Sequence, residues 1–214
     1  MPSAPPPLIF QDRLDAARQL AGRLQVYRDQ HPLVLAIPRG AAPMAHALAV
    51  ALQGDFDVVL VRKLGAPFSP EFAIGSVDES GWTYIAPDVA SVGADADYIA
   101  AEKKRQMETI RQRRVQYTPL RTAQDPTGRT VIVVDDGMAT GATMVAALHG
   151  LRQRQPRTLV CAVPVASPEA LEKVRPLADV VVCLQAPDNF RAVGQFYRDF
   201  AQVEDSEVMA LLLR

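Results

Sequence analysis

Cysteine and histidine are scarce in this chain of 214 residues, which contains two cysteines and three histidines. Cys161 and Cys183 each lie inside a run of β-branched residues, far from any histidine or cysteine at metal-ligand spacing. His46 and His149 likewise have no partner at metal or catalytic-triad spacing. We therefore expect two buried free thiols, and neither a disulfide framework nor a zinc site.

The sequence also lacks a charge excess and a long apolar segment. The formal net charge is −1, so the charge balance gives no reason to expect nucleic acid or an acidic membrane surface as a partner. The uncharged stretch at residues 40–54 is shorter than a membrane span and contains a proline and a histidine. Residues 1–10 have neither the basic start nor the apolar core of a signal peptide and are typical of a short proline-stiffened tail. We expect a cytoplasmic protein.

What the sequence does contain is an alternation of short β-branched runs and helix-like stretches. A strand at residues 33–37, a helix at 43–52 and a strand at 58–61 form a βαβ unit, which implies a parallel sheet. No repeat or linker divides the chain, so we predict a single domain over residues 1–214 with a doubly wound α/β fold and a mostly parallel sheet. The other expected elements are helices at 12–27, 96–116, 142–154 and 206–213, strands at 131–134, 158–165 and 180–184, and a short helix after residue 168.

Two segments interrupt this pattern. Residues 64–85 are rich in glycine and proline, which predicts a flexible lid whose weak strand runs at 72–77 and 82–85 would form a hairpin. Residues 185–214 are aromatic-rich before the final helix, which predicts a small C-terminal hood with a closing helix.

The most informative segment is VIVVDDGMATGAT at residues 131–143. Its apolar run predicts a strand buried on both faces, and the acid pair Asp135 and Asp136 at the strand end needs partners outside the core. Gly137 and Gly141 allow a tight turn before the helix, where N–H groups and threonine hydroxyls form a cradle for an anion. Because a carboxylate accepts hydrogen bonds from both hydroxyls of a diol, the combination suits a phosphorylated ribose.

This segment resembles the signature of the type I phosphoribosyltransferases, which bind 5-phosphoribosyl 1-diphosphate (PRPP) together with Mg²⁺. The resemblance implies that Asp135 and Asp136 hold the ribose hydroxyls, steady the reacting sugar and are the candidate protein contacts of the metal, which PRPP itself mainly carries. The PRPP-binding residues that it implies are Asp135, Asp136, Gly137, Met138, Ala139, Thr140, Gly141, Ala142 and Thr143.

Further pieces resemble the pyrophosphate site of the same family. Arg39 and Gly40 follow the first strand of the sheet, where open α/β sheets place ligands, and would hold pyrophosphate through a guanidinium and backbone N–H groups. Lys63 stands at the lid entry, where several branches of the family have an Arg-Lys pair, and is our third catalytic candidate beside the two acids. Glu71 is the lid carboxylate that we consider for acid–base work.

The sequence defines the residues that would contact the acceptor base less well. The 6-oxopurine branch carries a third acid in its phosphate loop, but this chain has Ala139 there, and an alanine cannot move a proton. Residues 188–194 resemble the hood that covers the base in purine-type members, which makes Phe190 the candidate for stacking on the base, unless it simply packs the last helix.

Two functions remain open from the sequence. The first is Mg²⁺-dependent phosphoribosyl transfer from PRPP to a nitrogenous base, giving a nucleoside 5′-monophosphate and pyrophosphate. The alternative is a PRPP-sensing regulator that binds nucleic acid or a protein partner, suggested by the basic residues of the helix at 96–116. The chain contains no recognisable nucleic-acid-binding module, so nucleic acid is not the expected partner. The start at Phe10–Arg13, the lid entry at Arg62–Pro67, residues 73–75 and the segment Tyr197–Phe200 make the chain most similar to bacterial phosphoribosyltransferases of unassigned acceptor. The family resemblance also implies a homodimer.

Overall fold

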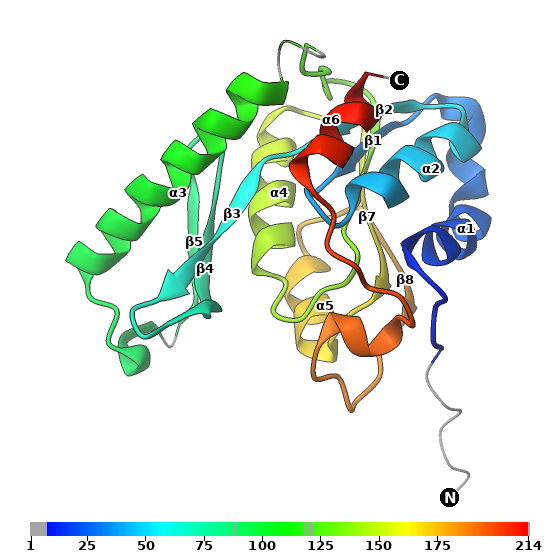
Figure 1. Cartoon of the computed structure of the whole chain (residues 1–214). Coiled ribbons are helices and arrows are strands. Elements are labelled where there is room, and N and C mark those ends of the chain that lie inside the picture. Colours follow the sequence, from blue (N-terminus) through cyan, green and yellow to red (C-terminus); the bar gives the residue numbers. More distant parts are fainter. Residues whose placement is uncertain (1–7, 88, 118, 120–121, 214) are drawn as a thin grey trace, which may run out of the picture.

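A five-stranded parallel sheet with the order β2-β1-β6-β7-β8 forms the centre of the molecule (Figure 1). The structure, a computed structural model, describes residues 8–87, 89–117, 119 and 122–213, without the side chain of Glu71; most of the predicted N-terminal tail therefore lies outside the described residues. The strands are β1 (Leu33–Ala36), β2 (Asp55–Val58), β6 (Thr130–Val134), β7 (Thr158–Val165) and β8 (Val180–Gln185).

Helices cover both faces of this sheet, which confirms the predicted doubly wound α/β fold. Helices α1 (Arg13–Leu24) and α2 (Ala42–Leu52) pack on one face, and α4 (Ala142–Gln153) and α5 (Pro168–Val174) pack on the other. Along β6, Ile132 and Val134 belong to the hydrophobic cluster that includes α1 and α2. Val131 and Val133 belong to the cluster that includes α4 and α5. The strand is therefore buried on both faces, as its continuous apolar run predicts.

The strand order reverses between β1 and β6, and this places the two predicted ligand loops side by side. The chain leaves β1 through α2 to β2 on one side, whereas β6, β7 and β8 follow on the other side. The carboxyl ends of β1 and β6 are adjacent, with Ala36 beside Val134. Open α/β sheets bind ligands at such a switch point, so Arg39 and the acid pair face the same space.

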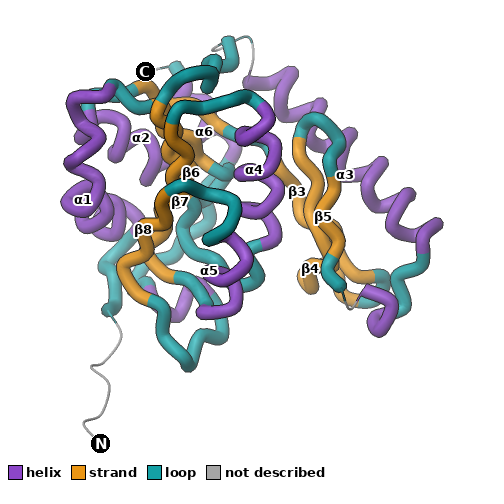
Figure 2. The backbone as a smooth tube through the Cα atoms, turned by 180° about the vertical axis from the view of Figure 1, so that it is seen from behind, coloured by secondary structure: helices purple, strands orange, loops and turns teal. Residues whose placement is uncertain are grey.

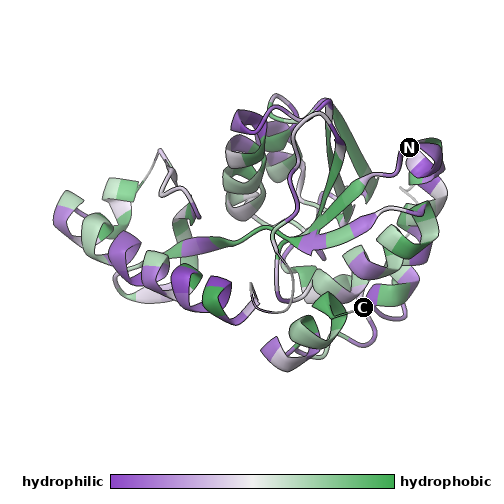
Figure 3. Ribbon diagram, turned by 90° about the horizontal axis from the view of Figure 1, so that it is seen from above, coloured by the Kyte–Doolittle hydropathy of each residue, from purple (hydrophilic) through white to green (hydrophobic). Residues whose placement is uncertain are grey.

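A second, antiparallel sheet of β3 (Val61–Ala66), β4 (Ser69–Asp78) and β5 (Thr83–Ile85) stands to one side of the main body (Figure 2). Helix α3 (Ala96–Tyr117) lies along it, and Figure 3 shows that this helix is largely hydrophilic, in contrast to the central strands. Residues 64–85, predicted as a lid with a hairpin, thus form most of this sheet; their closure over the cleft stays a prediction. The short 3-10 helices are η1 (Gln25–Gln30), η2 (Val89–Val92) and η3 (Val193–Phe196).

The predicted strand at residues 58–61 is wrong, because two strands of different sheets meet there. β2 ends at Val58, and β3 begins at Val61. The N–H of Val59 still donates to the carbonyl of Ala36 at 2.9 Å, after which the chain leaves the central sheet. An unbroken apolar run shows burial but not the point at which a chain passes from one sheet to another.

Two side-chain contacts fix the small sheet to α4. The Ser76 hydroxyl donates to the carbonyl of Ala142 at 2.6 Å, at the start of the helix. Near the end of the helix, the ring of Trp82 stacks on His149 with centroids 3.6 Å apart and an interplanar angle of 9°. The β4–β5 hairpin is thereby joined to the helix whose first turn ends the predicted phosphate loop, residues 137–143.

We expect His149→Ala to lower the free energy of unfolding by about 1–2 kcal/mol, because the stacked pair and its packing are lost. Trp82 is the single tryptophan of the chain, so its fluorescence reports this contact, and its emission should shift to the red. Urea unfolding with fluorescence detection measures both effects. The control is His46→Ala, because His46 lies on α2 and its ring contacts Phe56 rather than Trp82. Equal emission spectra in the two variants would contradict the contact between Trp82 and His149.

The C-terminal segment returns to the main body before it ends in α6 (Asp205–Leu212). The N–H of Phe10 donates to the carbonyl of Phe196 at 2.8 Å, and the rings of Phe10 and Tyr197 lie 5.4 Å apart. Helix α6 then packs between α2 and α3 (Figure 1). Among the residues that the structure describes, no helix has both the length and the apolar character of a membrane span.

Candidate functional site

A cleft of about 930 Å³ opens at the carboxyl ends of β1 and β6, between the main body and the small sheet. Most of the predicted ligand-binding residues line it, although they come from three separate segments. These residues are Arg39, Gly40, Lys63, Asp135, Asp136, Gly137, Met138, Ala139, Thr140, Gly141 and Thr143. The fold therefore brings the predicted ribose, phosphate and pyrophosphate contacts to one surface.

The acid pair lies at the floor of this cleft. The backbone N–H of Asp136 donates to Oδ1 of Asp135 at 2.9 Å, which orients the Asp135 carboxylate. Burial raises the pKa of Asp135 well above its ordinary value, and the negative charge of Asp136 raises it further. Burial also raises the pKa of Asp136, although the Arg13 guanidinium opposes that rise. Two carboxylates held together in this way are prepared to receive hydroxyl donors or a cation.

Arg13, on the first turn of α1, is a cleft residue to which sequence reasoning assigned no role. Its Nε donates to Oδ2 of Asp136 at 2.9 Å, and its Nη1 donates to the carbonyl of Ala201 at 2.7 Å. The guanidinium carbon also lies 4.0 Å from the centroid of the Phe200 ring. Arg13 belongs to the Phe10–Arg13 start by which the chain resembles its bacterial group, and this was the available signal.

We expect Asp135→Asn to stabilise the ligand-free protein by about 1 kcal/mol at neutral pH, because it removes charge repulsion at a functional site. An amide oxygen can still accept from the N–H of Asp136. The raised pKa means that the protonated Asp135 favours folding, so its contribution is present at low pH and is lost as the pH rises through that pKa.

The advantage of Asp135→Asn over wild type should therefore grow with pH and shrink toward the ordinary pKa of aspartate. Guanidinium unfolding of both proteins over a pH series measures this difference. A difference that does not vary with pH would contradict the raised pKa.

The phosphate loop is tied to the main body through its carbonyl groups. Ser167 donates from its N–H to the carbonyl of Met138 at 2.9 Å and from its hydroxyl to the carbonyl of Ala139 at 2.7 Å. Lys173 Nζ donates to the carbonyl of Thr140 at 3.3 Å. Because the N–H of a peptide points opposite to its carbonyl, these bonds direct the loop N–H groups away from α5, as an anion cradle requires.

Two glycines of the loop are required by geometry. Gly141 has φ of 74°, a left-handed conformation that favours glycine, immediately before α4 begins. A Cβ at Gly137 would lie 2.6 Å from Cγ1 of Val193 and 3.1 Å from Cγ1 of Val165. Gly40, at the end of β1, is similar, since a Cβ there would overlap the carboxylate of Asp136. The close approach of β1, β6 and η3 therefore depends on these positions.

Positive charge gathers at the α3 end of the cleft. Arg62 and Lys63 come from β3, and Arg39 from the turn after β1, where the Pro38–Arg39 peptide bond is cis. Burial lowers the pKa of Arg62, and the charges of Arg113 and Arg39 lower it further. Such crowding of cations favours an anion with several charges.

The predicted base contact, Phe190, is not among the residues that line the cleft. It packs against Phe196 with ring centroids 5.3 Å apart, which is the packing role considered as the alternative. Phe200 lines the cleft instead, together with Val193 and Val203. The side chain of Glu71 lies outside the described part of the chain.

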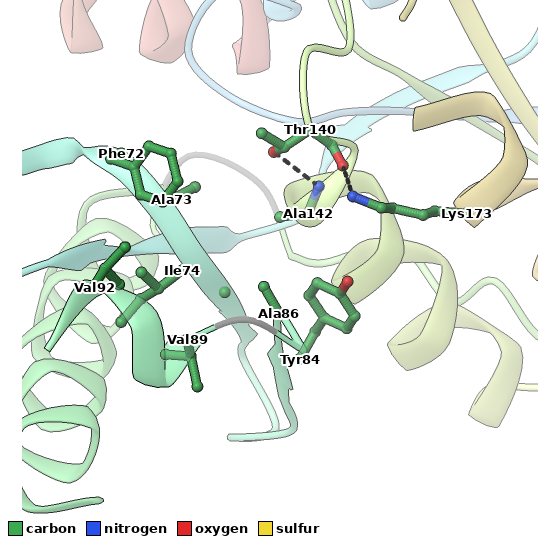
Figure 4. Close-up of a pocket in the computed structure, with 11 residues that line it drawn as sticks. Phe72, Ala73, Ile74, Tyr84, Ala86, Val89, Val92, Thr140, Ala142 and Lys173 are labelled. Atoms are coloured by element: carbon green, nitrogen blue, oxygen red, sulfur yellow. Dashed lines mark hydrogen bonds between the residues drawn. The ribbon is translucent and has the colours of Figure 1, made fainter. Parts of the chain in front are cut away.

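A smaller cavity of about 150 Å³ lies behind the phosphate loop, under the small sheet (Figure 4). Ala142, which the sequence assigned to PRPP binding, borders this cavity together with Thr140 and Lys173. Its other walls are mostly apolar and come from β4, β5 and η2.

The Phosphoribosyl transferase domain family matches residues 9–201. The chain belongs to this family. The match covers both the parallel sheet and the small sheet, together with the acid pair and the phosphate loop.

Two relatives that are more than 40% identical to this chain agree with the family assignment. One relative is a Mycobacterium tuberculosis protein whose name describes it provisionally as a phosphoribosyl transferase. It is 41% identical to this chain over 207 residues, which are 96% of this chain and 47% of that protein. The chain thus spans about half the length of the curated relatives it matches. The crystal structure of TT1426 from Thermus thermophilus has a TM-score of 0.80 at 45% identity and covers 96% of this chain and 98% of its own.

A more distant structure shows the fold alone. A Neisseria gonorrhoeae protein with bound ppGpp has a TM-score of 0.55 at 14% identity, with 98% of each chain covered.

Proposed function

We propose that the cleft binds PRPP and that the protein transfers its phosphoribosyl group to a nitrogenous base, giving a nucleoside 5′-monophosphate and pyrophosphate. The observation that carries this proposal is the convergence of an acid pair, an anion loop and a cationic wall at one switch point. Each part matches a different portion of PRPP, namely the ribose diol, the 5′-phosphate and the pyrophosphate. Family membership supports phosphoribosyl transfer in general.

In this proposal the chain acts mainly by positioning and charge stabilisation. Asp135 and Asp136 accept hydrogen bonds from the ribose hydroxyls and stabilise the positive charge that develops on the ring as pyrophosphate leaves C1′. The N–H groups of the loop from residue 139 onward hold the 5′-phosphate, whereas the N–H of Met138 donates to the carbonyl of Val165 at 3.0 Å. Arg39 and Lys63 take up the negative charge of the leaving pyrophosphate.

Magnesium fits this donor set. Mg²⁺ retains several waters and binds through one or two carboxylates together with phosphate oxygens, and the acid pair can supply those carboxylates. Among the described residues, no cluster of three or more histidine, cysteine or acidic side chains offers a separate metal cage. When bound, the metal would neutralise charge on the pyrophosphate.

The base would enter beside η3, where Val193, Phe200 and Val203 form the apolar side of the cleft. Ala139 supplies no acid there, so proton transfer falls to another group or to the nucleophile itself. Phe200 is better placed than Phe190 to contact a base, by its position in the cleft wall.

Pyrophosphate release tests the proposal. The protein is incubated with PRPP and Mg²⁺, with and without a panel of purine, pyrimidine and other bases, and both pyrophosphate and nucleotide are measured. We expect base-dependent release that Asp136→Asn suppresses. Equal release without any base would indicate hydrolysis, and no release with any base would contradict transferase activity.

The regulator alternative gains no support from α3. Arg105, Arg111, Arg113 and Arg114 lie within ion-pair distance of acidic side chains, which reduces the charge open to a nucleic acid. Retention on heparin at moderate salt would still reveal such a surface. The homodimer and the cytoplasmic location stay predictions.

A further inference from the structure

Arg39, the proposed pyrophosphate ligand, already has carboxylate partners from the C-terminal end of the chain. Its Nη1 lies 3.1 Å from Oε2 of Glu204 and 3.5 Å from Oδ2 of Asp205. Both acids lie at the start of α6, and Glu204 is 165 positions from Arg39 in the sequence. A pyrophosphate group that uses this guanidinium must share it with these carboxylates or displace them.

The segment that brings the acids to the cleft, residues 199–205, is here called the C-terminal strap. Arg13 holds it at one end through the carbonyl of Ala201 at 2.7 Å. Gln202 and Val203 line the cleft itself, and the Gln202 amide donates to Oε1 of Glu204 at 3.0 Å. The strap therefore crosses the cleft wall between the ribose acids and the cationic end.

The two acids differ in how firmly they are held. Asp205 accepts from the Tyr117 hydroxyl at 2.9 Å and lies 3.7 Å from Nε of Arg113, so it is tied to α3. The side chain of Glu204 is 57% exposed, whereas that of Arg39 is 26% exposed. Glu204 can leave Arg39 for water at small cost, while Asp205 keeps its other partners.

We propose that Glu204 competes with the pyrophosphate group for Arg39 and so limits the affinity of the cleft for pyrophosphate. This inference rests on the proposed function, because it assumes that Arg39 binds pyrophosphate. The competition weakens the binding of the multiply charged pyrophosphate and favours its release after transfer. It also links occupancy of the cleft to the position of the strap, since displacement of Glu204 frees one contact between α6 and the turn after β1.

The expected size follows from the exposure of the pair. A partly exposed ion pair of this kind changes an equilibrium about two- to five-fold. Glu204→Gln keeps the shape of the side chain and its contact with the Gln202 amide but removes the competing charge. Affinity for pyrophosphate should rise by this factor.

Calorimetric titration with pyrophosphate and Mg²⁺ tests the proposal on wild type, Glu204→Gln, Arg39→Gln and the double variant. Glu108→Gln is the matched control, because Glu108 is also 57% exposed and pairs with Arg111 on the outer part of α3. We expect Glu204→Gln to bind about two- to five-fold more tightly than wild type. The gain should disappear in the Arg39→Gln background. Urea unfolding checks that α6 remains folded.

The outcomes separate this inference from the proposed function. If wild type binds pyrophosphate but Glu204→Gln and Glu108→Gln bind equally, the competition is overturned while the pyrophosphate site stands. A gain that persists in the Arg39→Gln background also overturns it, because the effect would then be general charge. If none of the proteins binds pyrophosphate, the proposed function loses its pyrophosphate site and the inference fails with it.

Discussion

Arg13→Met is expected to lower the free energy of unfolding by about 2–3 kcal/mol at neutral pH, because it leaves a largely buried carboxylate without its cation. The side chains of Arg13 and Asp136 are 12% and 14% exposed, so solvent screens this pair only weakly. Methionine preserves much of the packing against Phe200 but cannot neutralise the acid pair. The loss should diminish at acidic pH, since burial already raises the pKa of Asp136 and protonation removes the unpaired charge.

A double-mutant cycle separates charge from packing in this prediction. Asp136→Asn in the Arg13→Met background should restore much of the lost stability, because no unpaired charge then remains at position 136. Arg23→Met, at an exposed position of the same helix, is the control. Chemical unfolding measures wild type, the two single variants, the double variant and Arg23→Met. An equal cost for Arg13→Met and Arg23→Met would refute the role of the pair.

Gly137→Ala should destabilise the protein by about 2 kcal/mol and weaken PRPP binding at least about ten-fold. A Cβ at this position would lie 2.6 Å and 2.9 Å from the two Cγ atoms of Val193, and Val165 blocks relief on the other side. The added methyl group must therefore displace η3 or the phosphate loop. Either movement alters the spacing between the acid pair and the loop.

A second substitution at Val193 should relieve this overlap. Val193→Ala in the Gly137→Ala background removes both contacting methyl groups and should recover most of the stability and part of the affinity. Gly22→Ala, where a Cβ meets nothing within 4 Å, is the matched glycine control and should leave binding unchanged. Failure of Val193→Ala to rescue either quantity would show that the packing described here does not limit the site.

The central fold and the phosphate loop were predictable from the sequence because each rests on a continuous segment. Residues 131–143 contain a strand, an acid pair and a glycine loop in one run, and the physical requirement for each is local. The order of strands and helices then predicts where the loop must lie, since parallel strands present their carboxyl ends at one edge. Arg39 and Gly40 were found by the same argument.

Contacts between distant segments were not predictable in this way. Arg13 reaches Asp136 across 123 positions, and Arg39 reaches Glu204 across 165 positions. No periodicity marks either pair, because the first depends on how α1 packs on the sheet and the second on how α6 packs between α2 and α3. The exchange of Phe200 for Phe190 in the cleft wall has the same cause, since the turn of η3 decides which aromatic ring faces inward.

Calorimetric titration of PRPP with Mg²⁺ into wild type and into Asp135→Asn/Asp136→Asn tests the central claim most directly. The account predicts a single site in wild type and a loss of at least about 100-fold in affinity in the double variant. Circular dichroism confirms that both proteins are folded. No binding by folded wild type, or equal binding by the double variant, would contradict the assignment of this cleft to PRPP.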